Sequence, residues 1–395
     1  MSQFPISAPT LESVLEGRRV LFVNAIRSDV PSGGNTSTQG MLARWRTRCS
    51  LQELSLNPRI SGGTPLGFAL ATLPAALFVM WARRSGHVWL EFLFRASPWL
   101  FLRCLWARWR TRPEVVVFNH HSSFLYLSAF AGCQRVLVWH DVPSLKRDGR
   151  REIATGVRRC AGLERMALSR AQFNVTFSFD DENALRRLHG RHSTVIPVID
   201  HAARPREAAS RPRRWLLIGN WTRAENCEGT QAFLIACAKL SAYTQDEAKA
   251  EAVFHVAGHD SEPFIARLRA RHPELQTLQL VTTARYDDIR GFEETALLAP
   301  LLRGAGIKLK TIEAWSVGIP VVGTAQAFSG LPAKIWHLGG LRMSSIEEMA
   351  RLCLTPGAYE SAAFSLDALS AYEAYQTKIH HSAGAPPRTK KDDTA

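Results

Sequence analysis

The sequence predicts an α/β protein built from two doubly wound, Rossmann-like domains, and three observations support this. The chain has 395 residues, enough for two domains that each bury a core. Short apolar runs, typical of parallel strands covered on both faces, alternate with helical patterns along the whole chain. A polar, arginine-rich and proline-containing stretch at 201–213 separates these runs into two groups, as a linker would.

These patterns divide the chain into an N-terminal arm, two domains, a linker and a tail. The arm has acidic residues and no apolar core, so it is not expected to be a secretory signal. The composition of the tail is that of a disordered segment. The expected bounds are 1–17 for the arm, 18–203 for the first domain, 204–213 for the linker, 214–380 for the second domain and 381–395 for the tail.

Each domain is expected to contain five strands. Those of the first domain are expected at 19–24, 114–118, 135–141, 174–178 and 194–200. Those of the second domain are expected at 215–220, 252–258, near 278, at 296–301 and at 321–324.

The composition narrows the class of function. A formal charge of +14 is compatible with binding to nucleic acid, to an anionic membrane surface or to an anionic substrate. Nucleic acid is disfavoured because the arginines cluster with tryptophan and leucine, and no helix-turn-helix, zinc or RNA-recognition pattern occurs. The seven cysteines are scattered without a C-x-x-C pair, so we expect no disulfide framework, no zinc site and a reducing cytoplasm.

Two helices predicted in the first domain have unusual surfaces. The helix at 66–82 carries no charge, although its 17 residues are marginal for a membrane span. In the helix after Ser97, five apolar residues fall on one arc and arginines flank it, which is typical of a peripheral membrane helix or of an ordinary packing helix. The apolar arc is formed by Trp99, Leu102, Leu105, Trp106 and Trp109. Arg103 and Arg110 flank it, and Arg108 lies opposite.

The stretch from Gly304 to Leu331 is the most informative part of the sequence. Gly304 and Gly306 precede a helical run of about three turns, so free N–H groups gather at a helix N-terminus and form an anion site. Lys308 and Lys310 add positive charge there. Gly318 is expected to end the helix before a short buried strand.

This stretch resembles the donor-site segment of the group 1 (family 4-like) retaining glycosyltransferases, which have two facing Rossmann-like domains in the GT-B fold. The resemblance lies in Gly304-Ala305-Gly306-Ile307-Lys308, Lys310, Glu313-Ala314, Gly318-Ile319-Pro320-Val321-Val322, Thr324 and Gly330-Leu331. It implies an enzyme that moves a sugar from a nucleotide-diphosphate sugar to an acceptor.

The resemblance also implies roles for individual residues. The donor diphosphate is expected at Gly304, Gly306, Ile307, Lys308 and Lys310. Arg223 is expected to contact the diphosphate from a neighbouring loop, and Gly33 and Gly34 are expected to face it from the first domain. Glu313 is expected to hold the ribose hydroxyls, and His140 and Asp141 are expected to be catalytic residues at the donor sugar. Without the resemblance, two other interpretations are equally good. Gly33-Gly34 is then a strand-to-helix turn capped by Asn35 or Thr36, and Arg223 is a solvated loop residue.

The sequence departs from the family at one position. Many members carry a second glutamate that contacts the transferred sugar, and here Ala305, or Arg303 with a shift for the glycine loop, takes its place. A catalytically silent binding protein is therefore the alternative to an active enzyme.

We expect neither a metal nor another cofactor. The helix N-terminus and the lysines can neutralise the leaving diphosphate, and the adjacent His120 and His121 should point in different directions on a strand. The expected partners are a nucleotide sugar, a glycolipid or oligosaccharide acceptor of cell-surface glycan synthesis, and the cytoplasmic face of an anionic membrane.

Overall fold

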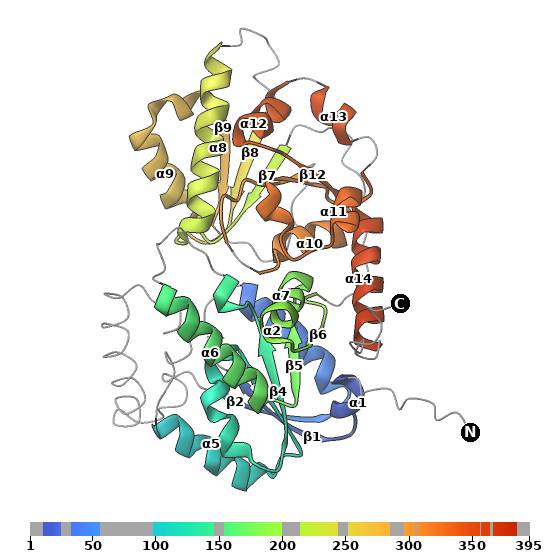
Figure 1. Cartoon of the computed structure of the whole chain (residues 1–395). Coiled ribbons are helices and arrows are strands. Elements are labelled where there is room, and N and C mark those ends of the chain that lie inside the picture. Colours follow the sequence, from blue (N-terminus) through green and yellow to red (C-terminus); the bar gives the residue numbers. More distant parts are fainter. Residues whose placement is uncertain are drawn as a thin grey trace, which may run out of the picture. The chain divides into compact units, whose positions relative to one another are not determined.

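A computed structural model describes residues 11–24, 33–55, 98–145, 154–199, 214–243, 252–284, 296–304, 306–355, 357–363 and 366–384. The chain divides into two compact units (Figure 1). Unit 1 comprises Met1–Asp200 and Lys378–Ala395, and unit 2 comprises His201–Thr377. The helix expected at 66–82, the linker at 204–213 and most of the terminal segments lie outside the described residues.

Each unit contains a six-stranded sheet whose neighbouring strands all run parallel, which confirms the predicted fold class. The order in unit 1 is β2-β1-β3-β4-β5-β6. The strands are β1 (Arg19–Asn24), β2 (Ser50–Ser55), β3 (Val115–Asn119), β4 (Gln134–Trp139), β5 (Phe173–Thr176) and β6 (Thr194–Val195). The edge strand β2 was not predicted, because its sequence is polar and mostly exposed.

Helices cover both faces of the unit 1 sheet. Residues of α5, η2 and α6 pack in one apolar core with alternate strand residues such as Leu21 and Val23. Phe22 points to the other face, where its ring lies 6.2 Å from that of Trp45 on α2. The bounds are α1 Leu11–Leu15, α2 Gly33–Arg46, α5 Pro98–Thr111, η2 His121–Phe130, η3 Pro143–Leu145, α6 Ala154–Arg170 and α7 Phe179–His189.

The sheet of unit 2 has the order β12-β11-β10-β7-β8-β9. The strand order reverses between β7 and β10 in unit 2 and between β1 and β3 in unit 1. We call each of these positions the switch point of its sheet. In open α/β sheets the carboxyl ends of the strands at such a point form the ligand-binding edge. The strands are β7 (Arg214–Ile218), β8 (Val253–Ala257), β9 (Gln279–Thr283), β10 (Ala296–Ala299), β11 (Val321–Gly323) and β12 (Gly340–Arg342).

Two helices of unit 2, α8 and α12, pack on the same face of its sheet and share one apolar core. Gly229 on α8 allows a close approach to β10, since a Cβ there would lie 1.6 Å from the carbonyl oxygen of Pro300. The bounds are α8 Ala224–Tyr243, α9 Ser261–Arg271, η5 Pro273–Thr277, α10 Leu309–Ser316, η7 Ala325–Phe328, α11 Ala333–Gly339, α12 Ile346–Leu354, α13 Ala358–Ala363 and α14 Ala368–Gly384.

The ends of the described chain differ from the expected bounds. Helix α14 continues to Gly384, four residues past the predicted end of the second domain, because no helix-breaking residue comes before that glycine. None of the helices in the described ranges is both long enough and apolar enough to cross a bilayer. All seven cysteines are free thiols.

Candidate active site

The glycine loop of unit 2 leads from β10 into α10. Gly304 and Gly306 have φ angles of 127° and 69°, which are accessible to glycine but strained for other residues. Helix α10 then begins at Leu309 with Lys308 as its N-cap, and its eight residues are fewer than the three turns predicted. Gly318, with φ of 81°, follows the end of the helix. The first N–H groups of α10 therefore lie beside the carboxyl edge of the sheet.

Side chains of unit 2 hold this loop from both sides. The Gln326 amide donates a hydrogen bond to the Gly304 carbonyl oxygen. Lys308 Nζ donates to the Gly306 carbonyl oxygen over 3.0 Å. Thr324 Oγ1 donates to the Leu301 carbonyl oxygen. Sequence reasoning missed the role of Gln326, because nothing in its neighbourhood shows that η7 returns to the glycine loop.

Lys310 lies in the first turn of α10 and reaches the end of β7. Its Nζ donates to the Ile218 carbonyl oxygen at 2.8 Å and lies 3.4 Å from Asn226 Oδ1. Burial, together with the positive charges of Lys308 and Arg223, lowers the pKa of Lys310 to about 8. A bound anion would favour the charged form of this lysine, so the position suits a phosphate group.

Two arginines near this edge are engaged in ion pairs. Arg223 is 59% exposed, and it pairs with Glu225 at 3.3 Å. Arg303 pairs with Glu228 on α8 at 2.5 Å. If the longer glycine loop shifts the family alignment by two residues, Arg303 takes the place of the family glutamate, and this pair then puts a cation at that position. Ala305, the other candidate for that position, lies outside the described residues.

The carboxyl edge of unit 1 is built around Asn119, the last residue of β3. Its amide nitrogen donates to Asn24 Oδ1 at 3.1 Å and to Thr38 Oγ1 at 2.9 Å. Its Oδ1 lies 2.7 Å from His140 Nε2. The ring of His140 also meets Phe177 edge to face, with the centroids 4.9 Å apart. This network joins β1, α2, β3 and the end of β4, and sequence reasoning did not find it.

The strand assignments at this edge need two corrections. Strand β4 ends at Trp139, so His140 and Asp141 follow the strand instead of closing it. His120 and His121 also lie beyond their strand, and their rings lie 4.1 Å apart rather than pointing in different directions. The reason is that His120 has a φ of 97°, which ends the alternation of side chains.

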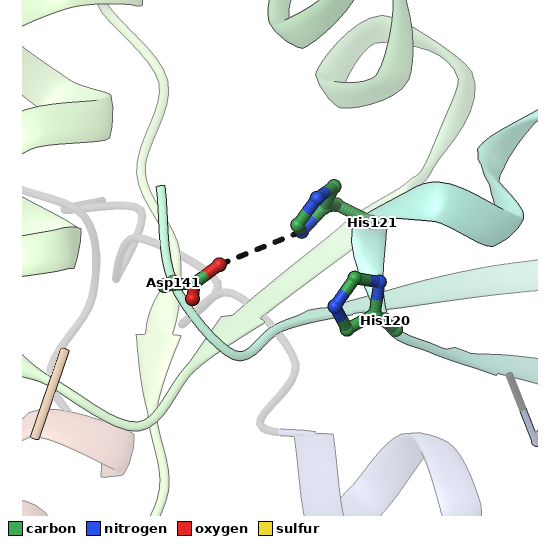
Figure 2. Close-up of side chains that lie close together, drawn as sticks. All are labelled: His120, His121 and Asp141. Carbon is green, nitrogen blue, oxygen red and sulfur yellow. Dashed lines mark ion pairs between the residues drawn. The ribbon is translucent and has the colours of Figure 1, made fainter. Parts of the chain in front are cut away.

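His120, His121 and Asp141 form a compact group whose ligand-type atoms lie within 4.8 Å of one another (Figure 2). Two contacts define the geometry of this group. The Ser122 N–H donates to His120 Nδ1 at 3.2 Å, so a neutral His120 ring carries its proton on Nε2. His121 Nδ1 and Asp141 Oδ1 are 3.9 Å apart. The group offers nitrogen and oxygen ligands of the kind that zinc accepts, and the expectation of no metal stays a prediction.

Two buried carboxyl groups hold the backbone that follows Asp141. Asp181 on α7 accepts a hydrogen bond from the Val142 N–H at 3.3 Å, and Glu164 on α6 accepts one from the Ser144 N–H at 2.8 Å. Glu164 also pairs with buried His189 at 2.7 Å. Burial, followed by the nearby charge of Asp141, raises the pKa of Asp181 to about 7. The loop after β4 is thus fixed from two helices.

Gly33 and Gly34 lie in the first turn of α2, not in the loop before it. Asn35 and Thr36 consequently lie inside the helix and cannot be its N-cap, as the alternative interpretation required. Glycine is tolerated in a first turn, because the N–H groups there have no partner within the helix. Thr38, one turn later, reaches the carboxyl edge through Asn119.

Helix α5 presents an apolar face to the surface. It packs inward through Leu100, Cys104 and Ala107. Four large apolar side chains of the predicted arc are instead exposed, to between 38% and 74%: Leu102, Leu105, Trp106 and Trp109. Arg110 lies over the Trp106 ring, with its Cζ 5.1 Å from the ring centroid.

Comparison with known proteins agrees with this architecture. Residues 212–372 match the family model described as Glycosyl transferases group 1. Among curated protein sequences, none matches this chain.

Solved structures with low sequence identity share the fold. HepE of Anabaena in complex with UDP and glucose is 12% identical, with a TM-score of 0.56 over 92% of this chain and 100% of that one. A glycosyltransferase from Rickettsia africae ESF-5 is 12% identical, with a TM-score of 0.56 over 93% of both chains. TarM is 11% identical, with a TM-score of 0.54 over 72% of this chain and 58% of that one.

Proposed function

We propose that the second domain of this chain, where residues 212–372 match the model described as Glycosyl transferases group 1, belongs to that family and that the protein transfers a sugar from a nucleotide-diphosphate sugar with retention of configuration. The observation that carries the donor assignment is the glycine loop, where Lys308, Lys310 and the α10 N-terminus bring positive potential to the switch point of unit 2. Glu313, one turn into α10, is our candidate for the ribose hydroxyls.

In this proposal the diphosphate leaves without help from a metal. The helix N-terminus and Lys310 stabilise the charge that develops on the leaving phosphate. His140 and Asp141 act at the donor sugar from unit 1, and the leaving phosphate itself accepts the proton of the acceptor hydroxyl. Transfer should therefore persist in EDTA, and loss of transfer that added Mg²⁺ restores would contradict this part of the proposal.

A thermal-shift screen with UDP-, GDP-, ADP- and CMP-sugars tests the donor assignment. UDP is the first nucleotide to try, because HepE of similar fold binds it. We expect one nucleotide class to stabilise the protein, and Lys310→Met to abolish that shift. The matched control is Lys239→Met, at an exposed position on α8. Failure of every nucleotide to stabilise the wild type would contradict the proposal.

A second candidate function is that of a silent, donor-binding protein. It is favoured by the Arg303–Glu228 pair, which puts a cation where many family members contact the sugar with a carboxylate. Hydrolysis of the bound donor separates the two functions. An active enzyme should release free sugar slowly from the stabilising nucleotide sugar, and a silent protein should bind it without turnover.

We further assign the acceptor to the glycolipids of an anionic, cytoplasmic membrane face. The support is the exposed face of α5, where Trp106 and Trp109 can enter the interfacial region while Arg110 remains near lipid phosphates. Each arginine near such a surface contributes about 1 kcal/mol. Lipid-linked oligosaccharides and lipopolysaccharide-type cores are acceptors of this kind.

Co-sedimentation with anionic vesicles tests this assignment. Trp109→Asp combined with Arg110→Glu should release the protein, and raised salt should release the wild type in part. Arg108 is left unchanged, because it donates to the Ala129 carbonyl oxygen and ties α5 to η2. The matched control on α7 is Arg187→Glu with Leu188→Asp, both at exposed positions. Wild-type protein that does not sediment at low salt would overturn the membrane assignment.

A further inference from the structure

We propose that Asn119 is a positioning residue that holds His140 in the tautomer with its proton on Nε2. The inference rests on the proposed function in one respect, namely that His140 acts at the donor sugar. It concerns residues of unit 1 only, and its first test needs no enzymatic activity.

The geometry assigns a different task to each end of the Asn119 amide. The nitrogen end donates twice, to Asn24 Oδ1 and Thr38 Oγ1, over 3.1 Å and 2.9 Å. An amide nitrogen has only two protons, so both are used by these partners. The oxygen end faces His140 Nε2 at 2.7 Å, and an oxygen there can only accept. His140 must therefore donate from Nε2.

The network is enclosed and has little freedom to rearrange. Asn119 and Thr38 are fully buried, and Asn24 is 6% exposed. Parallel pairing places Asn24 directly beside Asn119 in the register of β1 and β3. Reversing the Asn119 amide would set its oxygen against Asn24 Oδ1, which is costly away from water. The tautomer of His140 is thus coupled to the core of unit 1.

This tautomer determines what His140 can offer a substrate. With the proton on Nε2, the Nδ1 atom of a neutral ring is an acceptor. An acceptor at that position suits a sugar hydroxyl, which is a donor. Phe177 packs edge to face against the same ring and restricts its rotation. Asn119 would therefore set both the direction and the chemical character of His140.

Nuclear magnetic resonance of the full chain, labelled with ¹⁵N-histidine, tests the tautomer directly. His140 is assigned by comparison with His140→Gln. We expect the wild type to show a slowly exchanging proton on Nε2 and none on Nδ1. Asn119→Asp keeps an accepting oxygen and should retain this proton, whereas Asn119→Leu should lose it. Asn183→Leu, at an exposed asparagine of α7 in the same unit, is the control and should leave the His140 signals unchanged.

Kinetics separate positioning from a merely structural role. Asn119→Leu should lower kcat by roughly 10²-fold, with little change in nucleoside diphosphate affinity. In the His140→Ala background the same substitution should cause no further loss, because Asn119 acts through His140. Asn119→Asp should restore most of the turnover. Thermal unfolding of each variant shows that it remains folded.

Three outcomes would overturn the inference. The first is a neutral His140 in the wild type with its proton on Nδ1, which would mean that the Asn119 amide has the opposite orientation. The second is loss of the Nε2 proton in Asn119→Asp. The third is an equal kcat loss from Asn119→Leu with and without His140. If no donor is turned over at all, the proposed function fails, and the resonance experiment still decides the tautomer.

Discussion

The carboxyl edges of the two sheets lie at equivalent switch points, yet they are chemically different. The edge of unit 2 is a glycine loop with lysines and a helix N-terminus, all suited to a highly charged ligand. The edge of unit 1 is a network of amides, imidazoles and buried carboxyl groups. In each, burial shifts a pKa toward neutrality, lowering that of Lys310 to about 8 and raising that of Asp181 to about 7.

This chemical difference suggests that the two edges have different functions in the proposed transfer reaction: one binds the donor and the other positions its sugar. In the proposed function, the glycine-loop edge of unit 2 gains binding energy from the ionic part of the donor. The hydrogen-bonded edge of unit 1 contributes less binding energy and fixes the geometry of a group at the donor sugar. Substitutions at the first edge should therefore affect affinity, and substitutions at the second should affect turnover.

The largest effect is expected from His140→Ala on the unit 1 edge. Loss of a group that positions the reacting sugar can cost about 10²-fold, so we expect kcat to fall by at least about that factor. Affinity for the free nucleoside diphosphate, measured by isothermal titration, should be unchanged. A large loss of diphosphate affinity would place His140 in a phosphate or structural role and remove the contrast between the edges.

The second effect concerns Asp181 and stability. Because the folded pKa is raised from 3.8 to about 7, its stabilising contribution is complete below pH 4 and is lost as pH rises through 7. Asparagine does not ionise, so Asp181→Asn should prevent the loss of stability at high pH. We expect it to raise the free energy of unfolding at pH 8 by up to about 4 kcal/mol, with little change at pH 4. Urea unfolding at both pH values measures this.

The control for this prediction is Glu16→Gln, at an exposed position of unit 1. It should leave the pH dependence of unfolding as in the wild type. Equal pH dependence in Asp181→Asn and the wild type would show that Asp181 is not responsible.

The third effect is a proton taken up with the diphosphate at the unit 2 edge. The folded pKa of Lys310 is depressed to about 8, so this group stabilises the fold above its unfolded pKa and loses that contribution as pH falls through 8. A bound diphosphate favours the charged lysine and should raise its pKa. Binding at pH 8.5 should therefore take up a proton and weaken as pH rises.

Titration in buffers of different ionisation enthalpy measures that proton. Lys310→Arg stays charged and should bind without proton uptake. Lys310→Met should lose about 2–3 kcal/mol of binding free energy. Binding enthalpies that do not depend on the buffer would mean that Lys310 does not meet the ligand.

The smallest effect is expected for Glu313→Gln, which keeps the shape of the side chain and removes its charge. Loss of a charge-assisted hydrogen bond to the ribose should weaken donor binding by about 1.5 kcal/mol, with little change in folding. Comparing the affinity for the full donor with that for inorganic diphosphate isolates the ribose contribution. Unchanged affinity for the donor would remove Glu313 from the site.

Much of the fold could be predicted from local patterns. The runs at 19–24 and 321–324 are short and apolar, so they were identifiable as strands, and Gly304 and Gly306 indicated the loop before α10. The polar edge strand β2 gave no such signal.

The hydrogen-bond network of unit 1 could not be predicted in the same way. Asn24, Asn119 and His140 are far apart in the sequence and meet only because β1, β3 and β4 pair in one register. A backbone angle caused the other error, since the positive φ of His120 turns two adjacent histidines to the same side. Neither register nor such an angle can be read from residue types.

The pairing of β7 with β10 at the switch point of unit 2 also determines when that unit can fold. Trp215 of β7 pairs with Ala296 of β10, so the central strand of unit 2 must wait for most of that unit to be synthesised before its second edge is covered. Until then β7 presents an apolar edge, Trp-Leu-Leu-Ile, of the kind that recruits other chains. Parallel pairings of such long sequence separation form slowly. We therefore expect refolding of this chain from urea to be slow and limited by aggregation, with soluble yield falling steeply as protein concentration rises.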